Sequence, residues 1–252
     1  MTTNSAEKML LDSHLKTLQL VSFRQQYEAV ALEATQQHHS YERYLLALAE
    51  QEVADRQVRR RRRLLKEAKL PVVKQLAEFD FTAIPAVNSQ QVWQLADGGY
   101  IDKREPIILI GNPGLGKTHI ATSLAFAATQ QMRRVRFFNV AALVGDLLTA
   151  QKENRVTQLI HRLQRYHLLV FDELGFIPFT ANGAQLMFQL CSALYEQTAL
   201  IITTNLAFSD WTQVFGDERL TVALLDRLTH RAHIIEFTGE SYRFRQRKQR
   251  QT

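Results

Sequence analysis

The sequence predicts an α/β fold in which a parallel five-stranded sheet lies between helices. After Pro71, short apolar runs alternate with amphipathic helical stretches, which is the pattern of a sheet buried on both faces. Before Pro71 the chain contains no glycine, and apolar residues recur at helical spacing. We therefore expect a small all-helical domain over residues 1–70 and an α/β domain over residues 71–252.

The helical domain should contain two main helices. Their apolar residues are Leu11, Leu15, Leu18, Phe23 and Tyr27, then Tyr41, Leu45 and Leu48. The polar segment 38–40 separates the two stretches, and Ser40 is suited to cap the second helix. This helix is expected to continue through an arginine-rich segment towards Leu70, because Pro71 lacks the amide hydrogen that a helix interior needs.

Five apolar runs after Pro71 are expected to form the strands of the sheet. They are residues 107–110, 135–138, 168–171, 200–203 and 233–237. Helical sequence separates the runs, as parallel strands require. Because ligands of open α/β sheets bind beyond the carboxyl ends of the strands, polar residues that follow these runs are candidates for function.

Composition limits the classes of protein to which the chain can belong. Its 252 residues, 46% of them hydrophobic, are enough for one substantial core and a small appendage. No apolar run approaches the roughly 20 residues of a membrane span, and the N-terminus lacks a signal-peptide pattern. Cys191 is the only cysteine and lies in an apolar helical stretch, as a buried thiol would. We expect a soluble cytoplasmic protein, and the net charge of +6 favours an acidic partner.

A glycine-rich turn follows the first predicted strand and precedes a predicted helix. Its residues match the phosphate-loop pattern G-x-x-x-x-G-K-[ST]: Gly111, Asn112, Pro113, Gly114, Leu115, Gly116, Lys117 and Thr118. Such a loop aims backbone amides at phosphates, while Lys117 can reach the β- and γ-phosphates and Thr118 can bind Mg²⁺. The expected ligand is a nucleoside triphosphate, with His119 beside it on the helix. The alternative is an ordinary turn next to a solvated lysine.

Two acidic residues follow the third predicted strand in the run LLVFDELGF. Asp172 can hold a metal ion, and Glu173 can orient and deprotonate an attacking water molecule. Since acidic residues also cap helices, a purely structural role is the alternative.

Two further side chains complete the expected catalytic group. Asn205 follows the run ALIITT, so its amide can meet the γ-phosphate and the attacking water at the same edge of the sheet. Arg227, in LLDRLTHR, is a cation that one subunit can present to the nucleotide of its neighbour. Arg219 and Arg231 are rivals for this role. The alternative for Asn205 is an ordinary turn residue, and the alternative for Arg227 is a solvated arginine on the surface.

These motifs follow the order found in the AAA+ ATPases, which the chain resembles over about residues 55–245. Walker A corresponds to 111–118, Walker B to 168–173, sensor I to Asn205 and an arginine box to Arg227. The chain looks most like the IstB family of transposition helper ATPases, relatives of the DnaC-type helicase loaders. The segments that carry this likeness are RRLLKEAKLPVVKQLAEFDF, LLVFDELGF, IITTN, WTQVFGD, LLDRLTHR and GESYRF.

The resemblance implies an AAA+ P-loop NTPase core that binds ATP and Mg²⁺ and hydrolyses ATP to ADP and phosphate. It assigns Lys117 and Thr118 to the triphosphate and the metal, and Asp172 and Glu173 to Walker B. It also implies a homo-oligomer on double-stranded DNA, in which an arginine acts in trans and the DNA is delivered to a partner transposase.

The C-terminal helical lid of most AAA+ proteins is expected to be absent, as it is in this family. Arg243 is then a candidate substitute for the second sensor. Three other functions stay open: a loader of a replicative helicase, a nucleotide-gated DNA-binding scaffold with little turnover, and a small-molecule kinase. For the kinase, neither an acceptor pocket nor a mobile lid can be found in the sequence.

Three basic segments are candidates for contact with DNA. The first is the run Arg59, Arg60, Arg61, Arg62 and Arg63. The second contains Lys152, Arg155, His161, Arg162 and Arg165, and the third Arg133, Arg134 and Arg136. Phosphate contacts would make affinity fall with salt, whereas the alternative is a solvated or partner-facing charged surface. Because zinc-finger, helix-turn-helix and ribonucleoprotein signatures are missing, we expect recognition of DNA shape and backbone.

Overall fold

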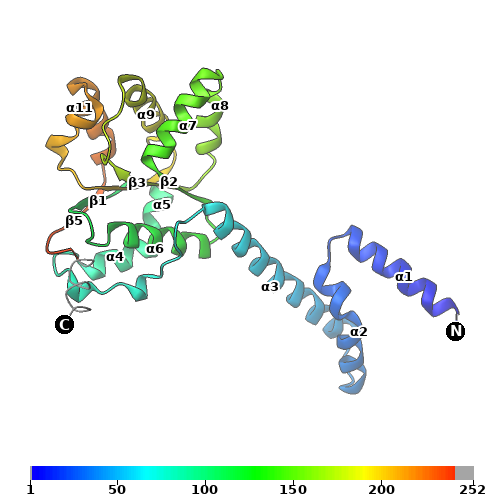
Figure 1. The fold of residues 1–252 in the computed structure, drawn as a ribbon. Helices are drawn as coiled ribbons and strands as arrows, with labels where there is room; N and C mark the ends of the chain where they lie inside the picture. Colours follow the sequence, from blue (N-terminus) through cyan, green and yellow to red (C-terminus); the bar gives the residue numbers. More distant parts are fainter. Residues whose placement is uncertain (1, 242–252) are drawn as a thin grey trace, which may run out of the picture. The chain divides into compact units, whose positions relative to one another are not determined.

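The chain folds into two compact units that meet between Arg63 and Leu64. A computed structural model describes residues 2–241, with helices alone in the first unit and a β-sheet with helices in the second (Figure 1). The boundary falls inside one helix, α3 (Tyr41–Ala68). The last turns of this helix belong to the second unit, since Ala68 is fully buried in that unit's core. The expected boundary near Pro71 lies just beyond the end of the helix.

The described part of the N-terminal unit contains α1 (Thr2–Thr17), α2 (Val21–Gln36) and most of α3. Where the sequence predicted one first helix, the chain breaks at Gln19, whose φ of 57° is left-handed. The Ser40 hydroxyl accepts a hydrogen bond from the Arg43 amide at 3.3 Å, so Ser40 caps α3 as predicted. The helix then runs for 28 residues through the arginine-rich segment.

A buried acidic side chain joins α2 to α3. Glu52 is 3% exposed and accepts hydrogen bonds from the Ser22 amide at 2.7 Å and from Arg56 and Arg59 at 2.7 and 3.0 Å. Burial favours a higher pKa for Glu52, but the hydrogen bonds from Arg56 and Ser22 outweigh it and hold the pKa below its usual range. Arg59, the first residue of the arginine run, therefore helps to hold this unit together.

The second unit is built on a five-stranded parallel sheet. Its strands are β1 (Ile107–Gly111), β2 (Val135–Asn139), β3 (Leu168–Leu174), β4 (Ala199–Thr204) and β5 (His233–Phe237). They stand in the order β2-β3-β4-β1-β5, and every neighbouring pair is parallel. All five predicted strands are confirmed. Because β4 lies between β1 and β3, its last residues stand between the ends of those two strands.

Helices cover both faces of this sheet (Figure 1). One face is covered by α4 (Ser89–Ala96), α5 (Gly99–Lys103) and α6 (Lys117–Gln130), with the 3₁₀ turns η1 (Leu76–Glu78) and η2 (Phe81–Ala83). The other is covered by α7 (Val140–Lys152), α8 (Val156–Leu163), α9 (Ala181–Leu194), η3 (Phe208–Asp210), α10 (Thr212–Phe215) and α11 (Glu218–Thr229).

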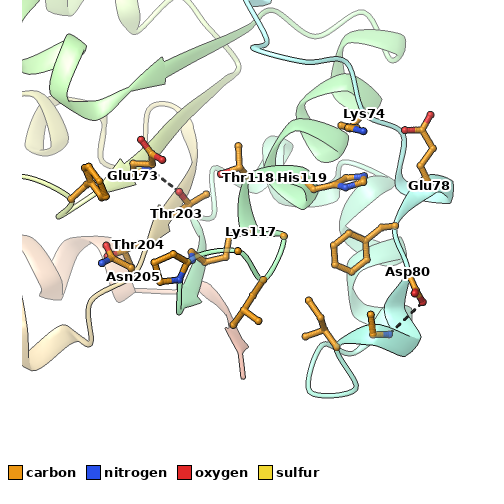
Figure 2. A pocket seen from close by; sticks show the side chains of 18 residues that line it. Lys74, Glu78, Asp80, Lys117, Thr118, His119, Glu173, Thr203, Thr204 and Asn205 are labelled. Carbon is orange, nitrogen blue, oxygen red and sulfur yellow. Dashed lines mark hydrogen bonds between the residues drawn. The ribbon is translucent and has the colours of Figure 1, made fainter. Parts of the chain in front are cut away.

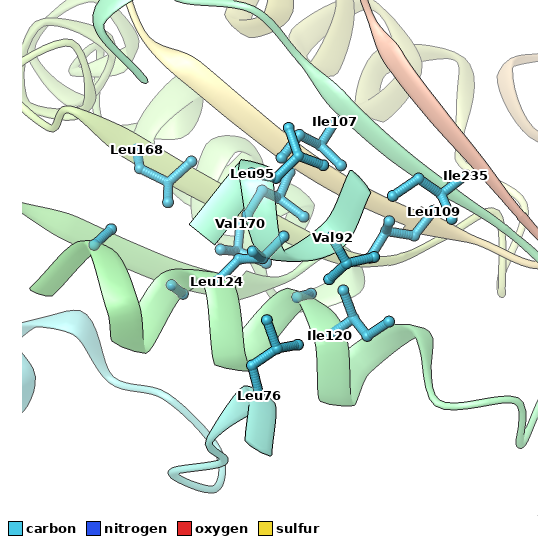
Figure 3. Packing of buried hydrophobic residues seen from close by; sticks show 14 of the residues in the cluster. Leu76, Val92, Leu95, Ile107, Leu109, Ile120, Leu124, Leu168, Val170 and Ile235 are labelled. Carbon is cyan, nitrogen blue, oxygen red and sulfur yellow. The ribbon is translucent and has the colours of Figure 1, made fainter. Parts of the chain in front are cut away.

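Successive side chains of β1, β3 and β4 enter opposite cores, as the pleat of a strand requires. In β3, Leu168 and Val170 lie in the same core as Leu124 of α6, which Figure 3 shows. Their neighbours Leu169 and Phe171 lie in the core on the other face. None of the five is more than 1% exposed. Burial of a side chain of this size contributes about 1.5–3 kcal/mol, so the sheet is held firmly between its helices.

The sequence predicted that no helical lid follows the last strand, β5, and that Arg243 could replace the second sensor. Within residues 2–241 no helix comes after this strand, so the described part of the chain has no helical lid. Arg243 lies outside the described residues. In the same part of the chain, none of the helices has the length and apolar character needed to cross a bilayer.

Candidate functional site

The segment after β1 forms a tight loop that requires glycine. Gly111, Gly114 and Gly116 have φ values of 145°, 84° and 91°, which residues with a Cβ rarely adopt. A Cβ at Gly111 would lie 2.1 Å from the Phe237 carbonyl oxygen, and one at Gly116 would lie 2.6 Å from the Phe79 ring. Gly116 is also the N-cap of α6. The loop thus leads into the amino end of a helix, where the helix dipole attracts anions.

Lys117 folds its side chain back over this loop. Its ammonium group donates hydrogen bonds to the carbonyl oxygens of Gly111 at 2.6 Å and Asn112 at 2.9 Å. Burial lowers the pKa of Lys117, although the nearby carboxylates of Asp172 and Glu173 oppose this effect. The loop therefore presents backbone amides and one cation at the same place.

A cavity of about 530 Å³ opens beside the loop at the carboxyl edge of the sheet. The loop lines it from Pro113 to His119, and the Leu115 side chain is also part of the buried core. Figure 2 shows two further walls, one on each side of Lys117 and Thr118. They consist of Glu173, Phe176, Thr203, Thr204 and Asn205, and of Lys74, Glu78, Phe79, Asp80, Ala83 and Ile84.

Asp172 connects the end of β3 to the loop. Its Oδ1 accepts hydrogen bonds from the hydroxyl groups of Thr118 at 2.9 Å and Thr203 at 2.6 Å. The carboxylate is only 6% exposed. Burial raises the pKa of Asp172, while the two hydroxyl donors oppose the rise. A carboxylate held in this way can serve as a fixed oxygen ligand.

Glu173 reaches across to β2. Its Oε2 accepts a hydrogen bond from Nδ2 of Asn139 at 2.8 Å, while Oδ1 of Asn139 caps α7 by accepting from the amide of Ala141 at 3.1 Å. The strand register explains this contact, because Asn139 of β2 stands beside Asp172 of β3. Sequence reasoning did not single out Asn139, whose only signal was its position directly after an apolar run.

His119 links α6 to the segment that precedes α4. Its Nε2 lies 3.4 Å from the Gln75 carbonyl oxygen, and its ring meets the Phe79 ring edge-to-face at 5.2 Å. Burial lowers the pKa of His119, which favours a neutral ring. Together with Ile84 these groups give the cavity an apolar wall away from the loop. No repeating pattern in the sequence predicted that these residues would form one wall of the cavity.

The structure brings Asn205 to the cavity but places Arg227 elsewhere. Arg227, on α11, donates a hydrogen bond to the Ala223 carbonyl oxygen at 2.8 Å and lies over the Phe188 ring at 5.3 Å. It borders a second hollow, whose lining includes Pro106 and Thr198. These two residues directly precede β1 and β4, so Arg227 stands at the amino edge of the sheet, opposite the phosphate loop. The rivals Arg219 and Arg231 are both exposed.

Two of the three basic segments are exposed. In the N-terminal unit, residues 59–63 of α3 are all exposed, although Arg59 is bound to Glu52. In the second unit, exposed basic residues lie on α7, on α8 and in the adjoining turns. They are Lys152, Arg155, His161, Arg162 and Arg165, of which Arg155 forms an ion pair with Glu153.

The third basic segment is engaged within its own unit. Arg133 forms an ion pair with Asp102 at 2.7 Å, and Arg136 donates a hydrogen bond to the Glu67 carbonyl oxygen at 3.0 Å. Arg134 lies over the Tyr166 ring at 5.2 Å. The three arginines of this segment thus have roles in holding the fold together, which explains their presence without a DNA contact.

The oxygen atoms of Thr118 and Asp172 suit a hard divalent cation. They are 2.9 Å apart at the amino end of α6. Mg²⁺ uses few protein oxygens and completes its shell with water and substrate phosphates. A hydroxyl and a carboxylate next to a phosphate loop therefore fit Mg²⁺.

The fold and the cavity together define an AAA+ P-loop protein, a class that binds nucleoside triphosphates. Its phosphate loop begins at the end of β1, its acidic pair lies near the end of β3, and β4 stands between these two strands. The sequence profile of the family described as "IstB-like ATP binding protein" matches residues 13–250. The chain belongs to this family.

Relatives from insertion sequences cover nearly the whole chain. A Pseudomonas aeruginosa protein named as an ATP-binding protein of insertion sequence IS21 is 34% identical over 238 residues, which are 94% of this chain and 90% of that protein. A Geobacillus stearothermophilus protein named for insertion sequence IS5376 is 33% identical over 241 residues, which are 96% of each.

Solved structures share the fold at low sequence identity. The DnaC helicase loader matches with a TM-score of 0.51 and 19% identity, over 60% of this chain and 88% of that one. The replication initiator DnaA, bound to AMPPCP and single-stranded DNA, matches with a TM-score of 0.55 and 16% identity, over 72% and 55% of the two chains. These likenesses confirm the predicted AAA+ fold.

Proposed function

We propose that this protein hydrolyses ATP to ADP and phosphate with the help of Mg²⁺. The observation that carries the proposal is the hydrogen bond between Thr118 and Asp172, which ties the phosphate loop to the acidic end of β3 at 2.9 Å. Glu173, the next residue, lines the same cavity as Lys117 and Asn205. A nucleotide-binding loop, an oxygen donor set for a metal and a carboxylate base thus meet in one place.

Each of these side chains has a task in phosphoryl transfer to water. Lys117 and the loop amides neutralise charge on the phosphates, and Thr118 and Asp172 hold the metal ion. When bound, Mg²⁺ supplies further positive charge to the phosphate oxygens. Glu173 accepts the proton of the attacking water, and the Asn205 amide orients that water. The protein forms no covalent bond to the substrate in this reaction, so positioning and charge stabilisation provide most of the rate enhancement.

Two substitutions test this assignment. Glu173→Gln should keep nucleotide affinity and abolish phosphate release, because the amide cannot accept the proton. Lys117→Ala should lose nucleotide affinity itself. Binding is measured with a fluorescent ATP analogue and turnover by phosphate release. Turnover at the wild-type rate in Glu173→Gln would reject Glu173 as the base.

We further propose that subunits assemble head to tail, so that Arg227 acts on the nucleotide of a neighbour. Arg227 stands at the edge of the sheet opposite its own phosphate loop, where it cannot serve its own cavity. Repeating such a contact, in which opposite edges meet, gives a ring or a filament.

Mixing two inactive variants tests action in trans. Arg227→Ala subunits keep Glu173, and Glu173→Gln subunits keep Arg227, so a mixed oligomer rebuilds complete sites at some of its interfaces. Turnover should reappear on mixing. Arg231→Ala, which removes an exposed cation on the same side of the sheet, is the matched control and should stay active alone. If Arg231→Ala is inactive and Arg227→Ala is active, the finger is Arg231.

We propose that the oligomer forms on double-stranded DNA and delivers it to a transposase. The proposal rests on relatives that are named for insertion sequences and on the exposed arginines and lysines of α3, α7 and α8. Such cations bind the phosphate backbone without reading bases, and each contact releases counterions.

Two charge-matched triple variants test the DNA surface. One replaces Arg60, Arg61 and Arg62 with glutamine, and the other replaces Lys152, Arg155 and Arg162. Both remove the same charge, so a difference between them reports position. A triple that removes phosphate contacts should weaken binding and lower the salt slope by about 0.9 for each contact. If neither changes affinity or slope, both surfaces are rejected.

The partner is tested by co-purification with the transposase of the same insertion sequence, with ATP and duplex DNA present. The complex should form with wild type and be lost with Lys117→Ala. Stable capture of a replicative helicase instead would favour a helicase loader.

A further inference from the structure

Glu173 has a backbone conformation that sets it apart from other residues of the described chain. Nine non-glycine residues there have positive φ values. Eight of them follow the end of a helix by one or two residues: Gln19, His38, Lys69, Arg104, Met132, Asn154, Glu196 and Arg231. Glu173, with a φ of 63°, lies inside strand β3. Strain at such a position persists only where the surroundings impose it, and it is common at functional sites.

A bulge in the pairing of β3 with β4 produces this conformation. Phe171 pairs with Ile202 and Leu174 with Thr204, so two residues of β3 stand opposite the single residue Thr203. Bulges of this kind redirect a side chain at the end of a strand. The two residues of the bulge are Asp172 and Glu173.

The hydroxyl group of Thr203 fills this bulge. Its Oγ1 accepts a hydrogen bond from the Glu173 amide at 2.9 Å and donates one to Oδ1 of Asp172 at 2.6 Å. A hydroxyl has one hydrogen and two lone pairs, so one atom can make both bonds. Thr203 is 1% exposed. The dashed line in Figure 2 between Glu173 and Thr203 marks the first of these bonds.

The neighbouring threonine cannot take over this task. Thr204 Oγ1 accepts a hydrogen bond from the Leu206 amide at 3.1 Å, within the turn that follows β4. Thr203 is therefore the residue of β4 whose side chain reaches both members of the acidic pair. Since Asp172 is bonded to Thr118 as well, a chain of hydrogen bonds joins Glu173, Thr203, Asp172 and the phosphate loop.

We infer that Thr203 is a positioning residue for ATP hydrolysis, whose single hydroxyl fixes the Asp172 carboxylate and the strained backbone of Glu173 together. The inference rests on the proposed ATPase function. Thr203 acts through Asp172 and Glu173, so its loss should slow turnover while leaving nucleotide binding largely intact.

Paired substitutions separate the hydroxyl from the rest of the side chain. Thr203→Val keeps the shape and removes both hydrogen bonds, whereas Thr203→Ser keeps the hydroxyl. Hydrogen bonds to charged groups are strong enough that kcat of Thr203→Val should fall roughly 10- to 100-fold. KM for ATP should change less than about threefold, because ground-state binding does not involve this hydroxyl. Thr203→Ser should recover most of kcat.

Thr129→Val is the matched control. Thr129 is 0% exposed, lies on α6, and its hydroxyl donates a hydrogen bond to the Phe126 carbonyl oxygen at 2.7 Å. This variant also removes a buried hydroxyl from the same unit and should keep wild-type kcat. If the valine methyl at position 203 prevents folding, Thr203→Ala removes the hydroxyl without adding atoms.

A readout without turnover is hydrogen exchange of the Glu173 amide, followed by NMR in the full chain. Exchange should speed up in Thr203→Val and stay slow in Thr203→Ser and Thr129→Val. The inference is overturned if Thr203→Val keeps wild-type kcat and exchange, or if Thr203→Ser is as slow in turnover as Thr203→Val. Wild type without any turnover on DNA would overturn the proposed ATPase function instead, while the exchange measurement still tests the bond.

Discussion

Replacing Gly116 with alanine should damage the phosphate loop through two separate effects. The φ of 91° is left-handed, which costs a residue with a Cβ about 1–2 kcal/mol. The new Cβ would also lie 2.6 Å from the Phe79 ring, which would have to move. That ring packs edge-to-face on His119 and Phe81, with centroids 5.2 and 4.8 Å away, and each such pair contributes about 0.5–1.5 kcal/mol. The sum predicts a loss of about 2–5 kcal/mol.

Gly145 provides a control of opposite sign. It lies inside α7, where a Cβ would meet nothing within 4 Å. Alanine there should stabilise the helix by about 0.5–1 kcal/mol, because glycine loses more conformational freedom on folding. For a domain of this size 1 kcal/mol corresponds to roughly 2–4 °C, so Gly116→Ala should lower Tm by roughly 4–20 °C and Gly145→Ala should raise it slightly.

Thermal unfolding followed by circular dichroism measures both changes, and a fluorescent ATP analogue measures binding. Gly116→Ala should also bind the analogue weakly, whereas Gly145→Ala should bind like wild type. Equal Tm and equal affinity for Gly116→Ala and wild type would refute the loop geometry. Equal losses of stability in both variants would show that the effect is not particular to the loop.

Three other outcomes are expected from contacts in the second unit. Asn139→Ser and Asn139→Asp both keep an oxygen that can cap α7, so the free energy of unfolding should barely change in either variant. The aspartate repels Glu173, so Asn139→Asp should lower ATP turnover more than Asn139→Ser does. Leu124→Ala, at a position 1% exposed, should destabilise by about 2–5 kcal/mol in urea unfolding, while Val222→Ala, 60% exposed, should change stability by less than about 0.5 kcal/mol. Burial raises the pKa of Cys191 to about 12 from an ordinary value of 9.0. A thiol reagent at pH 8 should therefore label Cys191 only after unfolding, and stability should decline above about pH 9, where only the unfolded thiol ionises.

The strands and the phosphate loop could be predicted because their signals are local. Each strand is a short apolar run, and the loop has a fixed glycine spacing next to Lys117 and Thr118. The break at Gln19 was missed because Leu15, Leu18 and Phe23 keep an apolar pattern across it. A local pattern does not report a left-handed residue when that residue is not glycine.

The remaining members of the site depend on which strands are neighbours. Thr203 reads as an ordinary β-branched strand residue, and its role arises only because β4 lies between β1 and β3. Asn139 meets Glu173 because β2 pairs with β3. Phe79 joins the cavity because the segment before α4 packs against the start of α6. None of these neighbours is close in sequence.

The helices that end in a left-handed residue other than glycine are sites where substitution could raise the stability of the protein. Apart from Arg231, those seven positions carry side chains that the proposed chemistry does not use, and glycine is the residue that best tolerates this backbone. Exchanging several of them for glycine would relieve backbone strain one helix end at a time. A more heat-resistant variant could thus be assembled while every atom around the nucleotide stays as it is.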